Sequence, residues 1–215
     1  MSTPGFPPNT LDSEGAPIWI SDLAVDDPNH ILHVVRGMDP AEALEALGAK
    51  PGLIRSCELP DGRPDERTSL PRAALGIEPG TSAVLLAGRV GEWTFVYDDS
   101  GSTYDDAATE ALSADGRTAA TSIYTINADA SLTYAVDGEQ VEWVNVDDLD
   151  LDEGFAGMPA ELRAAFEAAG NVETEDFEPG EADGDITMRA ACALAGLALT
   201  LDDVRRVPLL VVPLG

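Results

Sequence analysis

The feature that most constrains the fold is a hydrophobic pattern that changes to a period of two after residue 82. Apolar and polar side chains then alternate in five short segments, as is typical of β-strands buried on one face. These segments cover residues 83–89, 93–98, 118–127, 131–136 and 139–146. Asp137-Gly138 between the last two is a strong hairpin signal, because a type I′ turn needs the positive φ that glycine adopts readily. Strands joined by such short links pair antiparallel, so the pattern predicts an antiparallel meander.

Helical patterns flank this meander. Asp39 can cap a helix that begins at Pro40, since proline is tolerated at the first helical position. Further helices are predicted over 159–169, over 185–194 and after Thr200, and further strands over 30–36 and within 53–59. We therefore expect an α+β fold, an antiparallel sheet of five or six strands with helices packed on one face.

The chain is long enough for one domain of generous size. It has 215 residues, of which 44% are hydrophobic, so wholesale disorder is not expected. Residues 1–16 are rich in proline and glycine and are predicted to form a flexible N-terminal tail, with a single α+β domain over 17–215.

Net charge excludes several classes of partner. The chain carries 40 acidic and 12 basic residues, a formal charge of −28. Nucleic acids and anionic membrane surfaces need a basic footprint, so neither is expected as a partner. Lys50 is the single lysine, beside eleven arginines, which suits a GC-rich genome or a salt-adapted proteome, and part of the acidity can have that origin.

The acidic residues are concentrated in one part of the chain. Residues 137–185 hold 17 acidic residues and one basic residue, Arg163, a net charge of −16. Such a block would steer a cationic partner, although a merely solvated face is the alternative. The residues that we expect near a partner-binding surface are Asp147, Asp148, Asp150, Asp152, Glu153, Glu173, Glu175, Asp176 and Glu178.

A second candidate site is aromatic. Strand alternation places large apolar side chains of neighbouring strands on one sheet face, either as the floor of the core or as the wall of a ligand pocket. The residues of this candidate pocket are Trp93, Tyr97, Tyr134 and Trp143.

Signals for catalysis and metal binding are weak. His30 and His33 are the only histidines, and on a strand their spacing points them to opposite faces. A calcium loop counted from Asp148 has Glu153 and Pro159 where glycine and glutamate are required. Asp98-Asp99 with Asp105-Asp106 could form a carboxylate pair, but nothing in the sequence orients it. We therefore expect no catalytic residues, no metal and no cofactor.

The two cysteines, Cys57 and Cys192, lie far apart and lack zinc-site spacing. Two reduced thiols in a cytoplasmic protein is the simplest interpretation, although a disulfide remains open. The first ten residues do not read as a secretory signal, and no apolar run reaches the roughly 20 residues that span a bilayer.

Several segments together resemble a known family. They are 39–49, Gly91-Glu92-Trp93-Thr94 with its strand, the hairpin around Asp137-Gly138, and Leu194 to Thr200 near the end. As an ordered set over residues 18–206 they resemble an uncharacterised domain family that is common in actinobacteria of the Streptomyces type. The resemblance implies a small cytoplasmic α+β domain and no particular reaction. Asp98, Ser100 and Ala195 depart from the family's pattern, which tends to have Glu, Asn and Thr there.

The hypothesis that follows is a non-enzymatic acidic interaction protein, of the immunity or inhibitor type, that binds a basic protein. One alternative is a small-molecule sensor or enzyme that uses the aromatic pocket. Another is a structural subunit of a larger assembly, which a large exposed apolar patch would support.

Overall fold

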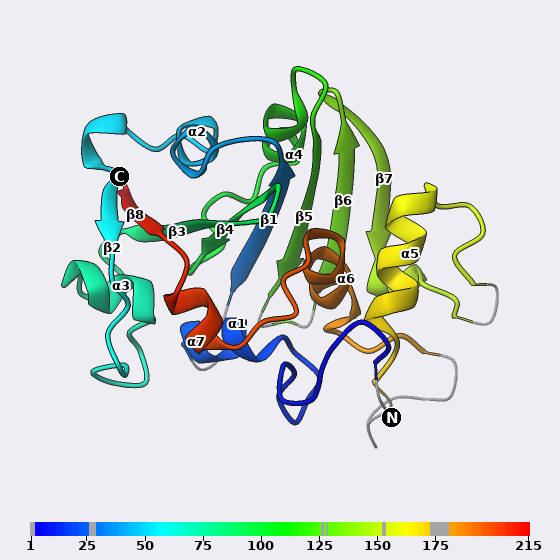
Figure 1. The fold of residues 1–215 in the computed structure, drawn as a ribbon, viewed down its shortest axis with the longest axis horizontal. Coiled ribbons are helices and arrows are strands. Elements are labelled where there is room, and N and C mark those ends of the chain that lie inside the picture. The colour runs from blue at the N-terminus through cyan, green and yellow to red at the C-terminus, as the bar shows by residue number, and fades with distance from the viewer. Residues whose placement is uncertain (1–2, 26–28, 126, 128, 152–153, 173–180) are drawn as a thin grey trace.

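The structure is a computed structural model that describes residues 3–25, 29–125, 127, 129–151, 154–172 and 181–215. Within these residues the chain forms seven α-helices, two short 3₁₀ turns and eight β-strands (Figure 1). The helices are α1 (Ile18–Leu23), α2 (Pro40–Ala46), α3 (Leu70–Leu75), α4 (Asp106–Ser113), α5 (Ala160–Ala169), α6 (Ile186–Ala195) and α7 (Leu201–Arg205), and the 3₁₀ turns are η1 (Pro51–Leu53) and η2 (Val146–Asp148). The strands are β1 (His30–Arg36), β2 (Arg55–Cys57), β3 (Ala83–Val90), β4 (Trp93–Asp98), β5 (Thr118–Tyr124), β6 (Ala130–Val136), β7 (Glu139–Asn145) and β8 (Leu209–Leu214).

All eight described strands pair antiparallel in one sheet, in the order β2-β8-β3-β4-β1-β5-β6-β7. The α+β class is confirmed, and the expected five or six strands are corrected to eight. The hairpin between β6 and β7 is also confirmed, since Asp137 and Gly138 both adopt positive φ, 52° and 78°. The sheet therefore ends at β2 on one side and at β7 on the other.

Helices cover both faces of the sheet and not one face as expected. Along β1, Leu32 and Val34 belong to a larger hydrophobic cluster, the first core, and Val35 belongs to a smaller one, the second core. Because neighbouring strand residues point to opposite faces, the two cores lie on opposite sides of the sheet. In Figure 1, α6 lies in front of the sheet and belongs to the first core. The second core takes its helical side chains from α2 and α4, for example Leu44 and Leu112.

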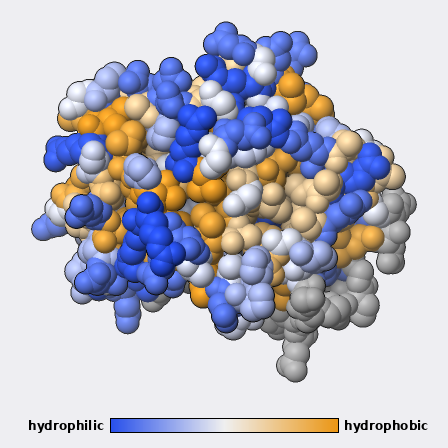
Figure 2. Space-filling view, viewed as in Figure 1, coloured by the Kyte–Doolittle hydropathy of each residue, from blue (hydrophilic) through white to orange (hydrophobic). Residues whose placement is uncertain are grey.

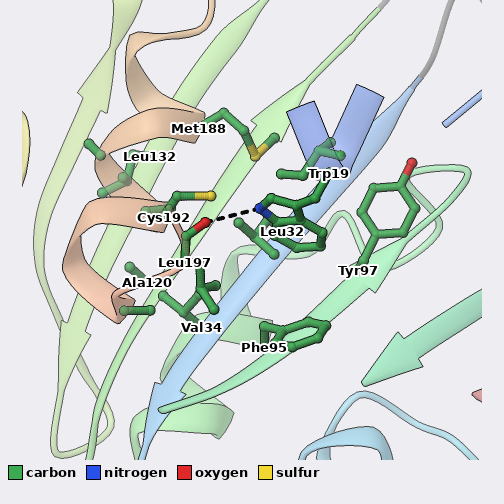
Figure 3. Packing of buried hydrophobic residues seen from close by; sticks show 14 of the residues in the cluster. Trp19, Leu32, Val34, Phe95, Tyr97, Ala120, Leu132, Met188, Cys192 and Leu197 are labelled. Carbon is green, nitrogen blue, oxygen red and sulfur yellow. Dashed lines mark hydrogen bonds between the residues drawn. The ribbon is translucent and has the colours of Figure 1, made fainter. Parts of the chain in front are cut away.

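Trp19 on α1 lies at the centre of the first core (Figure 3). Its ring meets Phe95 edge-on at 5.3 Å, and its indole N–H donates to the carbonyl of Leu197 at 3.1 Å. The polar atom of a fully buried tryptophan is thus satisfied, and this hydrogen bond offsets the cost of removing the indole N–H from water. The contact joins the N-terminal helix to the segment after α6.

The segment that was expected to be a flexible tail contacts the domain in the described residues. Phe6 is buried in the first core, and the amide of Gly5 donates to the carbonyl of Ala168 at the end of α5. An added Cβ at Gly5 would lie 2.8 Å from that of Ala168, so glycine permits this close approach.

Candidate functional site

β7 is a sheet edge with exposed apolar side chains. Val141 and Trp143 are 50% and 48% exposed, and they are two of the three large apolar residues with high exposure in the described part of the chain. Val144 is buried in the first core, so strand alternation turns Trp143 to the opposite face. The pairing of β6 with β7 is irregular at Tyr134, where the register shifts by one residue. This shift leaves Val141 unpaired at the edge.

The backbone of β7 also presents a donor at this edge. The amide of Trp143 donates to the side-chain carboxylate of Glu142 at 3.2 Å. No described residue outside β6 exchanges a backbone hydrogen bond with β7. The Trp143 amide therefore faces away from the sheet and is occupied by a side chain of its own strand.

A hollow of about 300 Å³ adjoins the end of β7. Its apolar lining comes from Leu149, Phe155 and Met158, and its polar rim includes Glu142 and Asp148. Trp143 is among its other lining residues. A second hollow of about 310 Å³ shares Asp148 and Leu149 with it and is lined mainly by acidic residues. The combination is an apolar recess with negative charge around it.

The expected acidic surface is described in part. Asp147, Asp148 and Asp150 are exposed at η2 and just after it, next to the hollows. Asp147 and Asp148, together with Glu139 at the start of β7, form no ion pair with a described residue. The other six expected residues lie outside the described residues, and they are Asp152, Glu153, Glu173, Glu175, Asp176 and Glu178. We call the exposed strip that includes Glu139, Glu142, Asp147, Asp148 and Asp150 the acidic edge.

Some carboxylates of the acidic block are neutralised inside the protein. Asp183 is buried and forms an ion pair with the fully buried Arg189. Glu161 forms an ion pair with Arg36 and also accepts from the hydroxyl of Tyr134 at 3.2 Å. The described part of the block is therefore not one solvated face, because some of its carboxylates are buried or paired while Glu139, Asp147 and Asp148 near β7 are exposed.

The four aromatic residues of the candidate pocket do not line one common surface. Trp93, Tyr97 and Tyr134 are buried in the first core, with exposures of 6%, 0% and 4%, and Trp143 lies at the edge on the other face. Arg36 stacks over the ring of Trp93 at 4.6 Å. The three buried rings serve as the floor for the helices.

Apolar residues gather across the middle of the molecular face that Figure 2 shows, over the region of α6 and α7. Leu194, Leu199 and Leu201 are only partly buried there, but they pack against the first core. This surface is the margin of that core.

His33 lies in the middle of a linear network of buried hydrogen bonds that runs from Thr109 to Asp98. Thr109 donates to Thr121 at 2.7 Å, and Thr121 contacts Nδ1 of His33 at 2.8 Å. Nε2 of His33 lies 2.8 Å from the hydroxyl of Thr103, which in turn donates to Asp98 at 2.7 Å. Because Thr103 gives its proton to Asp98, it accepts from Nε2–H, and Nδ1 accepts from Thr121. Every member has a partner, so these hydrogen bonds hold a neutral histidine in place.

The two histidines point to opposite faces, as predicted. His30 contacts the rings of Tyr97 and Tyr124, whereas His33 contacts the threonines on the other side of the sheet. Burial lowers the pKa of each histidine to about 4, and the carboxylate of Asp98 opposes this shift only in part. Both side chains are therefore neutral at pH 7.

The proposed carboxylate pair is not assembled. Asp98 is held by the His33 chain, whereas Asp99 is paired with the buried Arg72, 3.0 Å from its Nε. Asp105 caps α4 by accepting from the amide of Ala107. Each of these carboxylates thus has a structural partner, and the side chain of Asp106 lies outside the description.

Within the described residues, no three His, Cys, Asp or Glu side chains lie close enough together to hold a metal ion. The calcium loop counted from Asp148 includes positions outside those residues. Cys57 and Cys192 are both free thiols. None of the described helices combines the length and apolar character needed to cross a bilayer.

Fold and site together define an α+β domain with an acidic sheet edge at β7. The chain belongs to a family of unknown function, DUF6461, which it matches over residues 18–207. No curated protein and no solved structure matches it. Membership agrees with the expectation of an uncharacterised domain family.

Proposed function

We propose that this protein is a non-enzymatic interaction protein of the immunity or inhibitor type, and that its acidic edge binds a basic protein partner. The observation that carries the proposal is the apolar hollow beside β7, lined by Leu149, Phe155 and Met158 and rimmed by Glu142 and Asp148. Apolar recesses supply affinity at protein interfaces, and surrounding charges supply steering and selectivity.

The negative charge of the acidic edge favours a partner with positive charge. The chain has a formal charge of −28, and residues 137–162 contain no lysine or arginine. An anionic partner would be repelled by both the local and the total charge, whereas a cationic one would be attracted over about a Debye length. The free thiols of Cys57 and Cys192 support binding of the partner in the cytoplasm. The proposal also includes an actinobacterial origin of the protein.

The test is the association of the protein with basic nuclease or toxin domains in about 50 mM and about 500 mM salt. We expect binding that weakens strongly in the higher salt. Asp147→Asn combined with Asp148→Asn should weaken binding by about 2- to 30-fold in the lower salt, because two exposed ion pairs are lost. Glu45→Gln combined with Glu66→Gln removes the same charge elsewhere and should leave affinity nearly unchanged. Absent binding, or binding insensitive to salt, would contradict the proposal.

A further inference from the structure

The edge strand β7 presents backbone hydrogen-bonding groups as well as charged side chains. We propose that the basic partner binds by adding a β-strand to this edge, as an extended segment in which cationic and apolar side chains alternate. The inference rests on the function proposed above and specifies how the partner is held. Strand addition gives affinity through main-chain hydrogen bonds and specificity through alternate side chains.

The Trp143 amide is the group that a new strand would use. It faces away from β6 and donates to the carboxylate of Glu142 at 3.2 Å. A backbone carbonyl of an added strand can replace this carboxylate as the acceptor of the Trp143 amide, in a hydrogen bond of the usual sheet geometry. Glu142 is then released and can pair with an arginine or lysine of the incoming segment. The exchange leaves no donor unsatisfied, and a basic segment gains from it an ion pair with Glu142 that a neutral segment cannot form.

The two ends of the sheet differ in a way that supports this assignment. The opposite edge strand, β2, has three residues, and its exposed members, Arg55 and Ser56, are polar. Very short edge strands resist pairing with other chains. β7 has seven residues and exposes Val141 and Trp143, so it has the length and the apolar side chains that strand addition needs.

Charge selects a basic partner over a second copy of this chain. Two β7 strands paired antiparallel about Glu142 would bring the two Glu142 side chains opposite each other. Like charges directly opposite each other in a sheet are destabilising, and each chain also carries −28. The same carboxylates attract a segment with arginine or lysine at those positions. The hollow lined by Leu149, Phe155 and Met158 is then available to an apolar side chain of the partner.

The experiment uses a nine-residue peptide of alternating valine and arginine and the same peptide with alternate backbone nitrogens methylated. Methylation keeps the charge and the side chains but blocks strand pairing. We expect the unmodified peptide to bind at least about tenfold more tightly in low salt, because the main-chain hydrogen bonds are lost in the modified one. Equal binding of both peptides would overturn strand addition and leave the acidic-edge function intact. Failure of both peptides while basic protein domains still bind would also overturn it, and failure of peptides and domains alike would remove both proposals.

Protein variants locate the peptide on β7. Trp143→Ala should weaken the unmodified peptide by about tenfold, because an exposed aromatic side chain at the pairing edge is lost. Tyr104→Ala is the matched control, since Tyr104 is 67% exposed and lies outside β7, and it should bind like the parent protein. Equal weakening by both variants would contradict the assignment. Sedimentation of the protein alone supplies a further test, because a dimer that Trp143→Ala dissociates would make a second copy the occupant and overturn the proposal.

Discussion

Removal of Arg189 tests how the structure next to the acidic block is held. The guanidinium is fully buried and donates to the carboxylate of Asp183, which is 3% exposed. It also donates to three carbonyls, those of Gly15 at 2.9 Å, Ala169 at 3.1 Å and Gly170 at 2.8 Å. One side chain therefore joins the N-terminal segment, the end of α5, α6 and the segment before α6.

Arg189→Met keeps most of the side-chain volume and removes every one of these bonds. The buried carboxylate of Asp183 is left without its cation, which costs about 3–5 kcal/mol of the free energy of unfolding. Each kcal/mol lowers Tm by about 2–4 °C in a chain of this size, so a decrease of about 6–20 °C is expected. Adding Asp183→Asn should restore part of the loss, because the uncompensated charge is then removed.

The assay is urea unfolding of the parent protein, of Arg189→Met and of the double variant with Asp183→Asn, together with Arg206→Met as the control for the same substitution. Arg206 pairs with Asp203 at the surface, where its side chain is 74% exposed, so its loss should change the free energy of unfolding by less than about 1 kcal/mol. If Arg189→Met were as mild as Arg206→Met, the view of the buried pair as a structural hub would be refuted.

Three further predictions concern single positions. Burial raises the pKa of Asp185 to about 7, above its unfolded value, so its favourable protonated form is lost as pH rises through 7. In denaturant titrations near pH 8, Asp185→Asn should therefore have a free energy of unfolding about 2 kcal/mol higher than the parent, a figure that allows for partial exposure of the side chain. Near pH 4 the two proteins should have the same free energy of unfolding. Gly88→Ala should lower the free energy of unfolding by about 1–3 kcal/mol, because its Cβ would lie 2.6 Å from the ring of Phe95; an unchanged value would contradict this packing. Burial raises the pKa of Cys57 to about 11 and also raises that of the more deeply buried Cys192, so a thiol reagent at neutral pH should label Cys57 slowly and Cys192 only after unfolding, as peptide mass spectrometry can show.

The elements that sequence patterns predicted correctly are those with a local signal. β4 and β6 put their alternating side chains into the first core, and the Asp137-Gly138 turn formed where the glycine required it. α2 begins at Pro40 behind a capping box made by Asp39 and Glu42. In each case the residues that determine the element lie within the element or next to it.

β8 was missed because its signal is not local. The sequence Leu209 to Leu214 contains Pro213, which argues against a strand inside a sheet. In the structure Pro213 lies opposite Val84, whose amide donates to the carboxylate of Asp99 at 3.0 Å. The backbone groups of Val84 are thus turned toward β4, and the proline has no hydrogen bond to complete with β3.

α3 and α4 were missed because they are short and begin in polar segments. Ser69 caps α3 and Asp105 caps α4, but both stand in stretches rich in charge and turn residues. α4 adds Leu112 to the second core, beside Ala43 and Leu44 of α2, on the face that was expected to be open. The strand count and the covering of both faces therefore depended on long-range packing.

The role of the acidic residues in binding stays a prediction, and the form of the sheet edge beside them was not predicted from the sequence. Asp147 and Asp148 were expected at a surface for a basic partner, and the structure places them, exposed, in η2, which directly follows the edge strand β7. Trp143 was grouped with Trp93 and Tyr134 on one aromatic sheet face, because the register shift near Tyr134 and the position of β7 in the sheet cannot be read from local alternation. Nothing in the sequence indicates that the backbone amide of Trp143 faces away from the sheet.

The most direct measurement of the central claim is the hydrogen-exchange rate of the Trp143 amide with and without a bound basic peptide. The free protein holds this amide only with the Glu142 side chain at the surface, so exchange should be fast. If the peptide adds a strand to β7, exchange at Trp143 should slow by at least about tenfold on binding. An unchanged rate at Trp143 under saturating peptide would contradict the account.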